Sequence, residues 1–115
     1  MPADCLFCRI VAGEIPADIV HRDDQVVAFR DIAPKAPTHV LVIPVEHLAS
    51  AADLGAGHGP LLERMFAVAV ERARADGVAE TGYRLVTNVG DDAGQSVHHL
   101  HLHLLGGRKL DWPPG

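Results

Sequence analysis

A short segment near the C-terminal end alternates histidine with leucine, and this alternation constrains both faces of a β-strand. Residues 95–107 have the sequence QSVHHLHLHLLGG. Because side chains alternate between the two faces of a strand, the segment 97–105 is predicted to place three histidines on one face and three leucines on the other. The two rows are His99, His101 and His103, and Leu100, Leu102 and Leu104. One face is therefore predicted to be core, and the other a functional site.

The strand alone leaves three explanations of the histidine row open. The histidines could be tolerated on a solvated face, bind Zn²⁺ or Fe, or include a nucleophilic imidazole that its neighbours orient. Stacked imidazoles repel one another once one is protonated, which disfavours the first explanation. The preceding turn favours the third, because Gly90 and Gly94 permit unusual backbone angles and residues 94–96 can present N–H groups and a hydroxyl to a phosphoryl oxygen. His98 falls on the leucine side or at the strand's entry.

The rest of the chain indicates one short helix, one long helix and several short strands. The helices are expected in 5–13 and 60–77, and the strands in 18–24, 25–32, 38–44, 83–90 and 97–105. Because the strands come in a run around one long helix, the predicted class is α+β with a largely antiparallel sheet. At 115 residues, the chain is expected to form a single domain over 1–115, with 106–115 as a C-terminal tail.

Charge and apolar patterning exclude several classes of partner. The formal net charge of −5 leaves no basic stripe for a nucleic-acid polymer, so a phosphorylated ligand is expected to be small. The N-terminal segment lacks the pattern of a secretory signal, and no apolar run approaches the ~20 residues that cross a bilayer. We therefore expect a cytoplasmic protein without a membrane partner. Cys5 and Cys8 form a C-x-x-C motif, which indicates a metal or redox site if the two are not simply buried.

Residues 99–105 match the His-x-His-x-His-x-x signature of the histidine-triad (HIT) superfamily. FRDIAPKAPTHVLVIP (29–44), TNVGDDAGQS (87–96) and the terminal WPPG resemble its Hint branch, the histidine-triad nucleotide-binding proteins. The resemblance implies a HIT-like fold, with a five-stranded antiparallel sheet that a homodimer extends to ten strands. It also implies hydrolysis of purine nucleoside 5′-phosphoramidates to a nucleoside monophosphate and an amine. The reaction would pass through a nucleotidyl-histidine intermediate and require no metal or other cofactor.

The same resemblance implies roles for individual residues. His101 would be the nucleophile, His99 would orient it, and His103 would contact phosphate oxygens. The other catalytic residues implied are Ser96, at the leaving nitrogen or a phosphate oxygen, and His39, which continues a relay behind the triad. The nucleotide-binding residues implied are Asp31 at the ribose hydroxyls, Asn88, Gln95, Ser96 and Val97 near the ribose-phosphate, and Phe7, Ile10, Phe29 and Ile32 around the base. The residues alone leave open turn roles for Asp31 and Asn88 and a core role for His39.

Two further features of the resemblance concern a metal and a partner subunit. Where histidine-triad proteins carry C-x-x-C, it resembles a structural zinc site completed by two histidines, here His47 and His99. This role competes with a relay role of His99, because one ring nitrogen cannot both bind metal and accept a proton. The Hint pattern usually has an aromatic residue in place of His98, so altered packing or a changed partner contact is expected there. Trp112 in the tail is expected to reach the partner's active site.

Three other functions remain as alternatives. A dinucleoside polyphosphate hydrolase belongs to a sister branch of the same superfamily, although the WPPG tail disfavours it. A nucleotide-binding module with vestigial hydrolysis would not need the complete set of three histidines with Ser96 and Asn88. A metal-dependent enzyme would use the histidine row as ligands.

Overall fold

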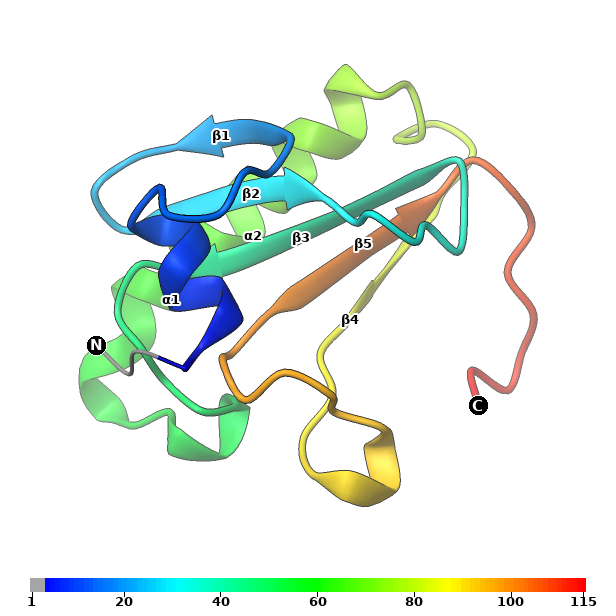
Figure 1. The fold of residues 1–115 in the computed structure, drawn as a ribbon. Helices are drawn as coiled ribbons and strands as arrows, with labels where there is room; N and C mark the ends of the chain where they lie inside the picture. Colours follow the sequence, from blue (N-terminus) through cyan, green and yellow to red (C-terminus); the bar gives the residue numbers. More distant parts are fainter. Residues whose placement is uncertain (1–3) are drawn as a thin grey trace.

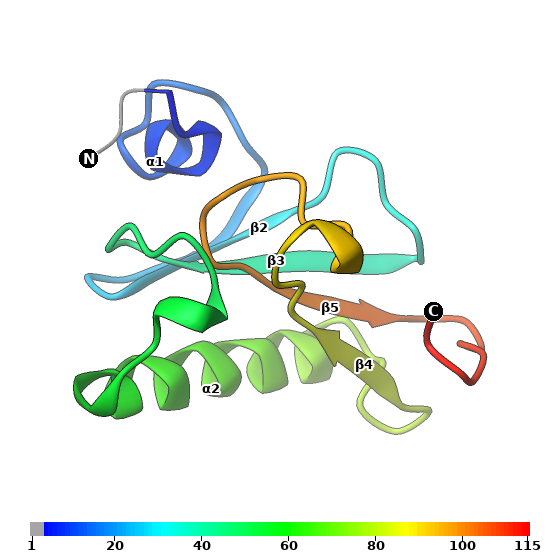
Figure 2. The ribbon, with the colours of Figure 1, turned by 90° about the horizontal axis from the view of Figure 1, so that it is seen from below.

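Five strands form one antiparallel sheet, with a helix packed on each face (Figures 1 and 2). The structure is a computed structural model that describes residues 4–115; residues 1–3, which begin the segment considered above for a secretory signal, lie outside the described residues. The helices are α1 (Leu6–Val11) and α2 (Gly59–Ala75), and the strands are β1 (Ile19–Arg22), β2 (Val26–Arg30), β3 (Thr38–Pro44), β4 (Tyr83–Val86) and β5 (Leu102–Gly106). The strand order is β1-β2-β3-β5-β4. The predicted α+β class with an antiparallel sheet is confirmed.

The two faces of the sheet carry separate apolar cores. On the α2 face, the core includes Val40 and Val42 of β3, Leu102 and Leu104 of β5, and Met65, Val68 and Ala69 of α2. On the α1 face, it includes Phe7 and Ile10 of α1 with Val27, Phe29, Leu41 and Ile43 of the central strands. Successive residues of β3 thus serve opposite cores, as strand alternation requires. Burial on both faces explains why β3 is buried along its whole length.

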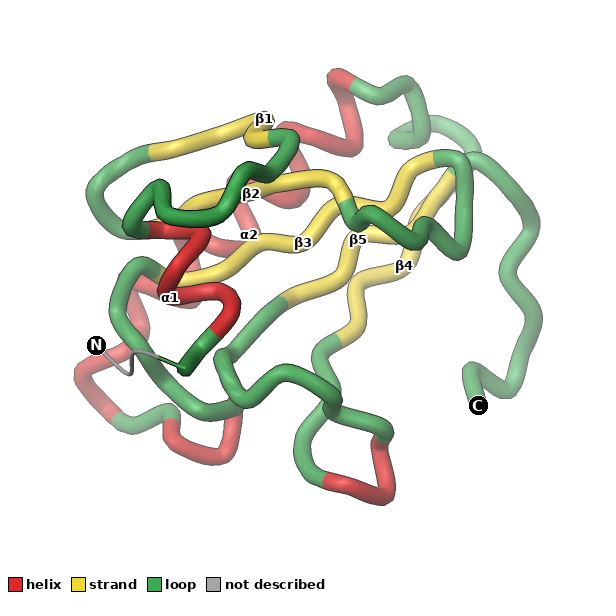
Figure 3. The backbone as a smooth tube through the Cα atoms, in the orientation of Figure 1, coloured by secondary structure: helices red, strands yellow, loops and turns green. Residues whose placement is uncertain are grey.

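The predicted strand over 97–105 is wrong in its first half. Strand β5 begins only at Leu102, and residues 87–101 form a long loop with one short turn of 3₁₀ helix (Figure 3). The expected strand over 83–90 is likewise shorter and ends at Val86. The loop bends through Gly90 and Gly94, which both adopt a φ of 80°, a value that side chains other than glycine rarely tolerate. His98 is exposed outside the strand rather than lying with the leucines.

The C-terminal end of α2 is tied to the sheet through one carboxylate. Asp76 follows the helix and accepts two hydrogen bonds from the Arg30 guanidinium of β2, at 2.7 and 3.0 Å. Thr38 of β3 and Arg72 of α2 also donate to it, each at 3.1 Å. These contacts, the one to Arg30 first, hold the pKa of Asp76 at about 2, below its ordinary value of 3.8. The carboxylate therefore joins two strands and a helix while it stays ionised.

Neither helix of the described chain has the length and apolar character that a membrane span requires.

Candidate active site

A cavity of about 260 Å³ opens on the α1 face of the sheet, between α1, strands β2, β3 and β5, and the loop before β5. Its volume is near the lower end of the ~300–1,000 Å³ typical of small-molecule sites. Most of the lining is apolar, and the polar groups are few. Among the residues predicted above, it gathers Phe7, Ile10, Phe29, Asp31, Ile32, Ser96, Val97, His101 and His103. An apolar pocket with a small polar end is the arrangement that suits a base joined to a phosphate.

His101 is held in one orientation by the main chain. Its Nδ1 lies 2.7 Å from the carbonyl oxygen of His99, and a carbonyl can only accept, so Nδ1 carries the proton. In the neutral ring, Nε2 then keeps its lone pair. The ring is 6% exposed and lines the cavity, where the Phe7 ring meets it edge-on at 5.1 Å. His101 therefore offers an unprotonated nitrogen to a ligand in the cavity, the form required of a nucleophile.

A hydrogen-bonded pair of histidines fixes the protonation of His103. The backbone N–H of Lys35 donates to Nδ1 of His39 at 3.1 Å, so Nε2 of a neutral His39 carries the proton. That nitrogen lies 2.9 Å from Nδ1 of His103 and donates to it. Nε2 of His103 must then carry a proton that it can donate to a ligand. Burial lowers the pKa of His103 to about 4, so the ring is neutral near pH 7.

Asp31 lies at the mouth of the cavity, just beyond β2. One carboxylate oxygen accepts the backbone N–H of Ala33 at 2.8 Å, which is the turn role that the sequence left open. The other oxygen lies 3.6 Å from Nε2 of His39. Since a carboxylate can accept several hydrogen bonds, these contacts leave capacity for hydroxyl donors from a ligand.

Four predicted residues lie differently from the others. The side-chain amide of Gln95 is buried and bonded to the backbone of Gly90, Ala49 and Val97, so it braces the loop and does not line the cavity. Asn88 is half-buried and also does not contribute to the lining. Ile32 lines the rim but is 98% exposed, and Trp112 is 82% exposed in the tail.

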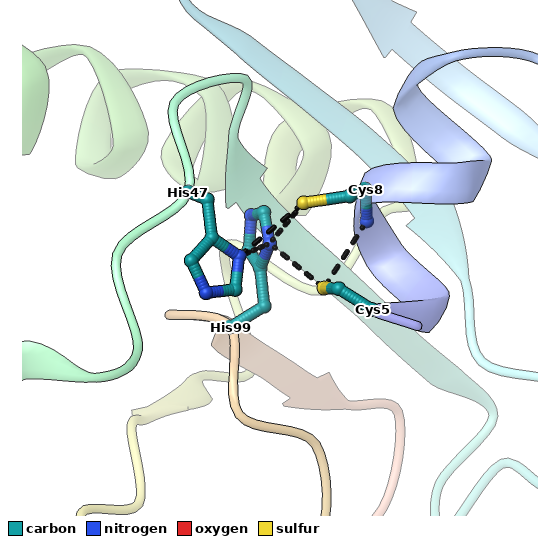
Figure 4. Close-up of side chains that lie close together, drawn as sticks. All are labelled: Cys5, Cys8, His47 and His99. Atoms are coloured by element: carbon teal, nitrogen blue, oxygen red, sulfur yellow. Dashed lines mark hydrogen bonds between the residues drawn. The ribbon is translucent and has the colours of Figure 1, made fainter. Parts of the chain in front are cut away.

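Beside the cavity, Cys5 and Cys8 face His47 and His99 (Figure 4). Nδ1 of His99 lies 3.4 Å from the Cys5 sulfur and 3.5 Å from the Cys8 sulfur, and Nδ1 of His47 lies 3.3 Å from the Cys8 sulfur and 3.2 Å from Nδ1 of His99. A tetrahedron with Zn–N of ~2.0–2.1 Å and Zn–S of ~2.3 Å has edges of roughly 3.3–3.8 Å. Both the spacing and the two-thiol, two-imidazole donor set therefore fit Zn²⁺.

His99 contributes to both sites through different atoms. Its Nδ1 faces the cysteine sulfurs, its Nε2 lies 2.9 Å from the carbonyl oxygen of Pro44, and its own carbonyl accepts the proton of His101. The ring does not point along the row of His101 and His103, contrary to the expected alignment of all three. The anticipated competition between a metal role and a relay role therefore does not arise in this geometry.

Sequence reasoning missed part of the cavity wall. The additional lining residues are Leu6, Ile15, Pro16, Ala17, Arg30 and Leu41. Leu41 could have been found by parity, because it alternates with Val40 and Val42 and pairs with His103 across β3 and β5. Residues 15–17 carry no periodic pattern, so no comparable signal identifies them.

Comparison with known proteins places the chain among histidine-triad proteins. The family model described as "Scavenger mRNA decapping enzyme C-term binding" matches residues 4–110. An uncharacterised HIT-like protein of Synechococcus elongatus is 50% identical over 100% of both chains, and the purine nucleoside phosphoramidase of Escherichia coli K12 is 49% identical over 96% of this chain and 92% of its own. The crystal structure of a HIT family hydrolase from Legionella pneumophila has a TM-score of 0.96 and 52% identity, covering 97% of this chain and 100% of that one. The chain belongs to the HIT family of hydrolases.

Proposed function

We propose that this hydrolase cleaves the P–N bond of purine nucleoside 5′-phosphoramidates and releases a nucleoside monophosphate and an amine. The observation that carries the proposal is the fixed tautomer of His101, whose unprotonated Nε2 belongs to a ring that lines an apolar-walled cavity. The purine nucleoside phosphoramidase of E. coli, 49% identical, supports the choice of substrate.

The proposed reaction has two displacement steps at phosphorus. In the first, Nε2 of His101 attacks, the P–Nε2 bond forms, the P–N bond breaks, and the amine leaves with a proton taken from its surroundings. In the second, water attacks the nucleotidyl-histidine, the P–Nε2 bond breaks, and one proton of the water is released to solvent. The monophosphate leaves as His101 returns to its neutral form with its proton on Nδ1. Each step needs stabilisation of charge on the non-bridging oxygens.

The residues around His101 suit this chemistry. The N–H on Nε2 of His103 supplies a donor for a phosphate oxygen, and Ser96, which lines the same cavity, supplies a hydroxyl for another oxygen or the leaving nitrogen. Asp31 would accept the ribose hydroxyls at the cavity mouth. The base would lie between Phe7, Ile10 and Phe29, whose apolar surfaces do not distinguish strongly between purines.

A panel of adenosine 5′-phosphoramidates that differ only in the amine tests this function. Turnover of the phosphoramidates at a kcat/KM at least ~10-fold above that for a dinucleoside polyphosphate is the expected result, and it would also define the preferred amine. The reverse ranking would assign the chain to the dinucleoside polyphosphate hydrolases. AMP binding without turnover of any substrate would make it a nucleotide-binding module.

We also propose that Cys5, Cys8, His47 and His99 hold a structural Zn²⁺ that takes no part in the displacement steps. The metal would cross-link α1 to the loops after β3 and before β5. Its reduced thiolate ligands accord with the cytoplasmic location that we propose. Protein purified without added zinc is expected to contain about one Zn²⁺ per chain, and a Cys5→Ser/Cys8→Ser protein close to none. A ratio far below one in the wild-type protein would contradict the proposal.

We further propose a homodimer that extends the sheet to ten strands across β4. Strand β4 is an edge strand with unpaired backbone groups, and α2 exposes 46% of Phe66 on the same protomer. The tail is tied to this edge, because Arg84 of β4 donates to the backbone oxygen of Asp111 at 2.8 Å. In such a dimer, Trp112, the next residue, would lie close to the partner subunit.

Sedimentation analysis tests the dimer. The wild-type chain is expected to sediment as a dimer, and a Phe66→Glu protein is expected to shift toward monomer, because the substitution places a charge in the apolar contact. Glu63→Gln, also exposed on α2, is the matched control and should remain dimeric. A wild-type chain that stays monomeric at all accessible concentrations would refute the assembly.

A further inference from the structure

Helix α1 is too short to be stable without support from the rest of the protein. It spans only Leu6–Val11, and isolated helices shorter than ~12–15 residues are marginal in water. Its side chains provide support on two sides. Phe7 and Ile10 pack on the sheet, and the two thiols, Cys5 at its N-cap and Cys8 within it, face His47 and His99. Arg22 of β1 also donates to the carbonyl of Val11 at 3.1 Å, and the cysteine–histidine cluster is the support that joins α1 to the two loops.

The same helix forms a wall of the nucleotide cavity. Leu6, Phe7 and Ile10 all line it. The Phe7 ring is a T-shaped neighbour of both His99, at 5.9 Å, and His101, at 5.1 Å. A displacement of α1 would consequently remove apolar surface from the base pocket and free the ring of His101 on one side.

A second path joins the cluster to His101 through two loops. His47 is followed by Leu48, whose carbonyl accepts the N–H of Leu100 at 2.6 Å, and His99 precedes Leu100. The loop after β3 and the loop before β5 are thus joined twice. The side chains of His47 and His99 meet in the cluster, and the backbone of the residues that follow them, Leu48 and Leu100, is hydrogen-bonded. The carbonyl of the fully buried His99 is the group that sets the tautomer of His101.

From these contacts, we propose that metal occupancy of the cluster controls nucleotide affinity through the wall that α1 provides. It also fixes the orientation of His101 through the carbonyl of His99, so the cysteines, His47 and His99 are positioning residues. With the metal bound, α1 and the two loops form one rigid unit around the cavity. Without it, α1 keeps its apolar contacts and the hydrogen bond from Arg22 to the carbonyl of Val11, but it loses the cross-link to the two loops, and the carbonyl of His99 is less firmly placed. The proposal rests on the proposed metal site, but it does not require the proposed hydrolysis.

The test compares zinc-loaded protein with protein stripped by a chelator, without measuring turnover. Three readouts are followed: the affinity for AMP by calorimetry, amide hydrogen exchange in residues 6–11, and the ¹⁵N signals of the His101 ring. Loss of zinc is expected to weaken AMP binding by at least about 10-fold, to speed exchange in α1, and to mix the ring tautomers of His101. Exchange in α2 should change little, which separates this effect from global unfolding.

Variants of His47 distinguish metal binding from simple packing. His47→Ala is expected to behave like the stripped protein, whereas His47→Cys, which retains a zinc-binding ligand set, should restore AMP affinity when zinc is added. His98→Ala is the matched control, because His98 is exposed and lies outside the cluster. Equal AMP affinity and equal α1 exchange with and without zinc would overturn the proposal. If no form binds AMP, this proposal fails together with the proposed function, whereas AMP binding that is independent of zinc overturns this proposal alone.

Discussion

Replacement of His101 by alanine is expected to lower the turnover of adenosine phosphoramidates by at least about 10⁴-fold, because removal of an enzymatic nucleophile leaves only the contribution of binding and charge stabilisation. Affinity for AMP should stay within a few-fold of the wild-type value. The ring contributes one wall contact to the cavity, whereas the base walls and Asp31 are unchanged. Steady-state kinetics and calorimetry on the same preparation measure the two effects.

The matched control for this substitution is His98→Ala, since His98 is exposed and outside the cavity lining. It should retain turnover close to wild type. Rapid quenching of the wild-type reaction followed by mass spectrometry should detect a nucleotidyl adduct that is absent from the His101→Ala protein. Wild-type turnover in the His101→Ala protein would show that another group attacks phosphorus.

The Asp76→Asn protein is expected to be less stable by about 2 kcal/mol at pH 7, and this loss should depend on pH. Asp76 has a pKa of about 2 in the folded protein and an ordinary value of 3.8, so its ionised form is favoured by folding. The contribution is complete above about pH 5 and is lost as the pH falls through the folded-state pKa. Urea denaturation of both proteins between pH 7 and pH 2 measures the difference.

The stability difference between the two proteins should therefore shrink toward zero near pH 2. Glu71→Gln provides the comparison, because Glu71 is exposed on α2 and its replacement should change stability by no more than about 0.5 kcal/mol at any pH. A difference between wild type and Asp76→Asn that is constant with pH would mean that lost packing, rather than the ionised network with Arg30, accounts for the destabilisation.

The elements that the sequence predicts well are those whose burial follows a period. Strand β3 has the predicted bounds, 38–44, and α2 occupies nearly all of 60–77. Strand β5 was predicted to start too early because the alternation of histidine and leucine continues before Leu102. There it reflects two different environments: His99 enters the cluster with the cysteines, and only His103 pairs across to Leu41 within the sheet.

For the site, the sequence likewise predicts which side chains take part better than it predicts the backbone atoms that orient them. Alternation and the C-x-x-C motif identify the histidine row and the two cysteines, whereas Asp31, His39 and His47 were implied only by the resemblance to histidine-triad proteins. What they cannot supply is the set of main-chain atoms that orient these groups. The carbonyls of Pro44, Leu48 and His99 and the N–H of Lys35 carry no residue-specific signal, and their positions depend on how two distant loops pack.

The hydrogen bonds from Lys35 through His39 to His103 have a direction that cannot be reversed. A peptide N–H does not give up its proton near neutral pH, so the far end of this chain is closed to proton exchange. Nε2 of His103 can donate a hydrogen bond to an anion, but a proton lost from Nε2 could not be replaced through His39 and Lys35. In the proposed reaction, the proton that the departing amine takes up is therefore expected from within the cavity, where the Ser96 hydroxyl, water or a protonated substrate nitrogen could supply it.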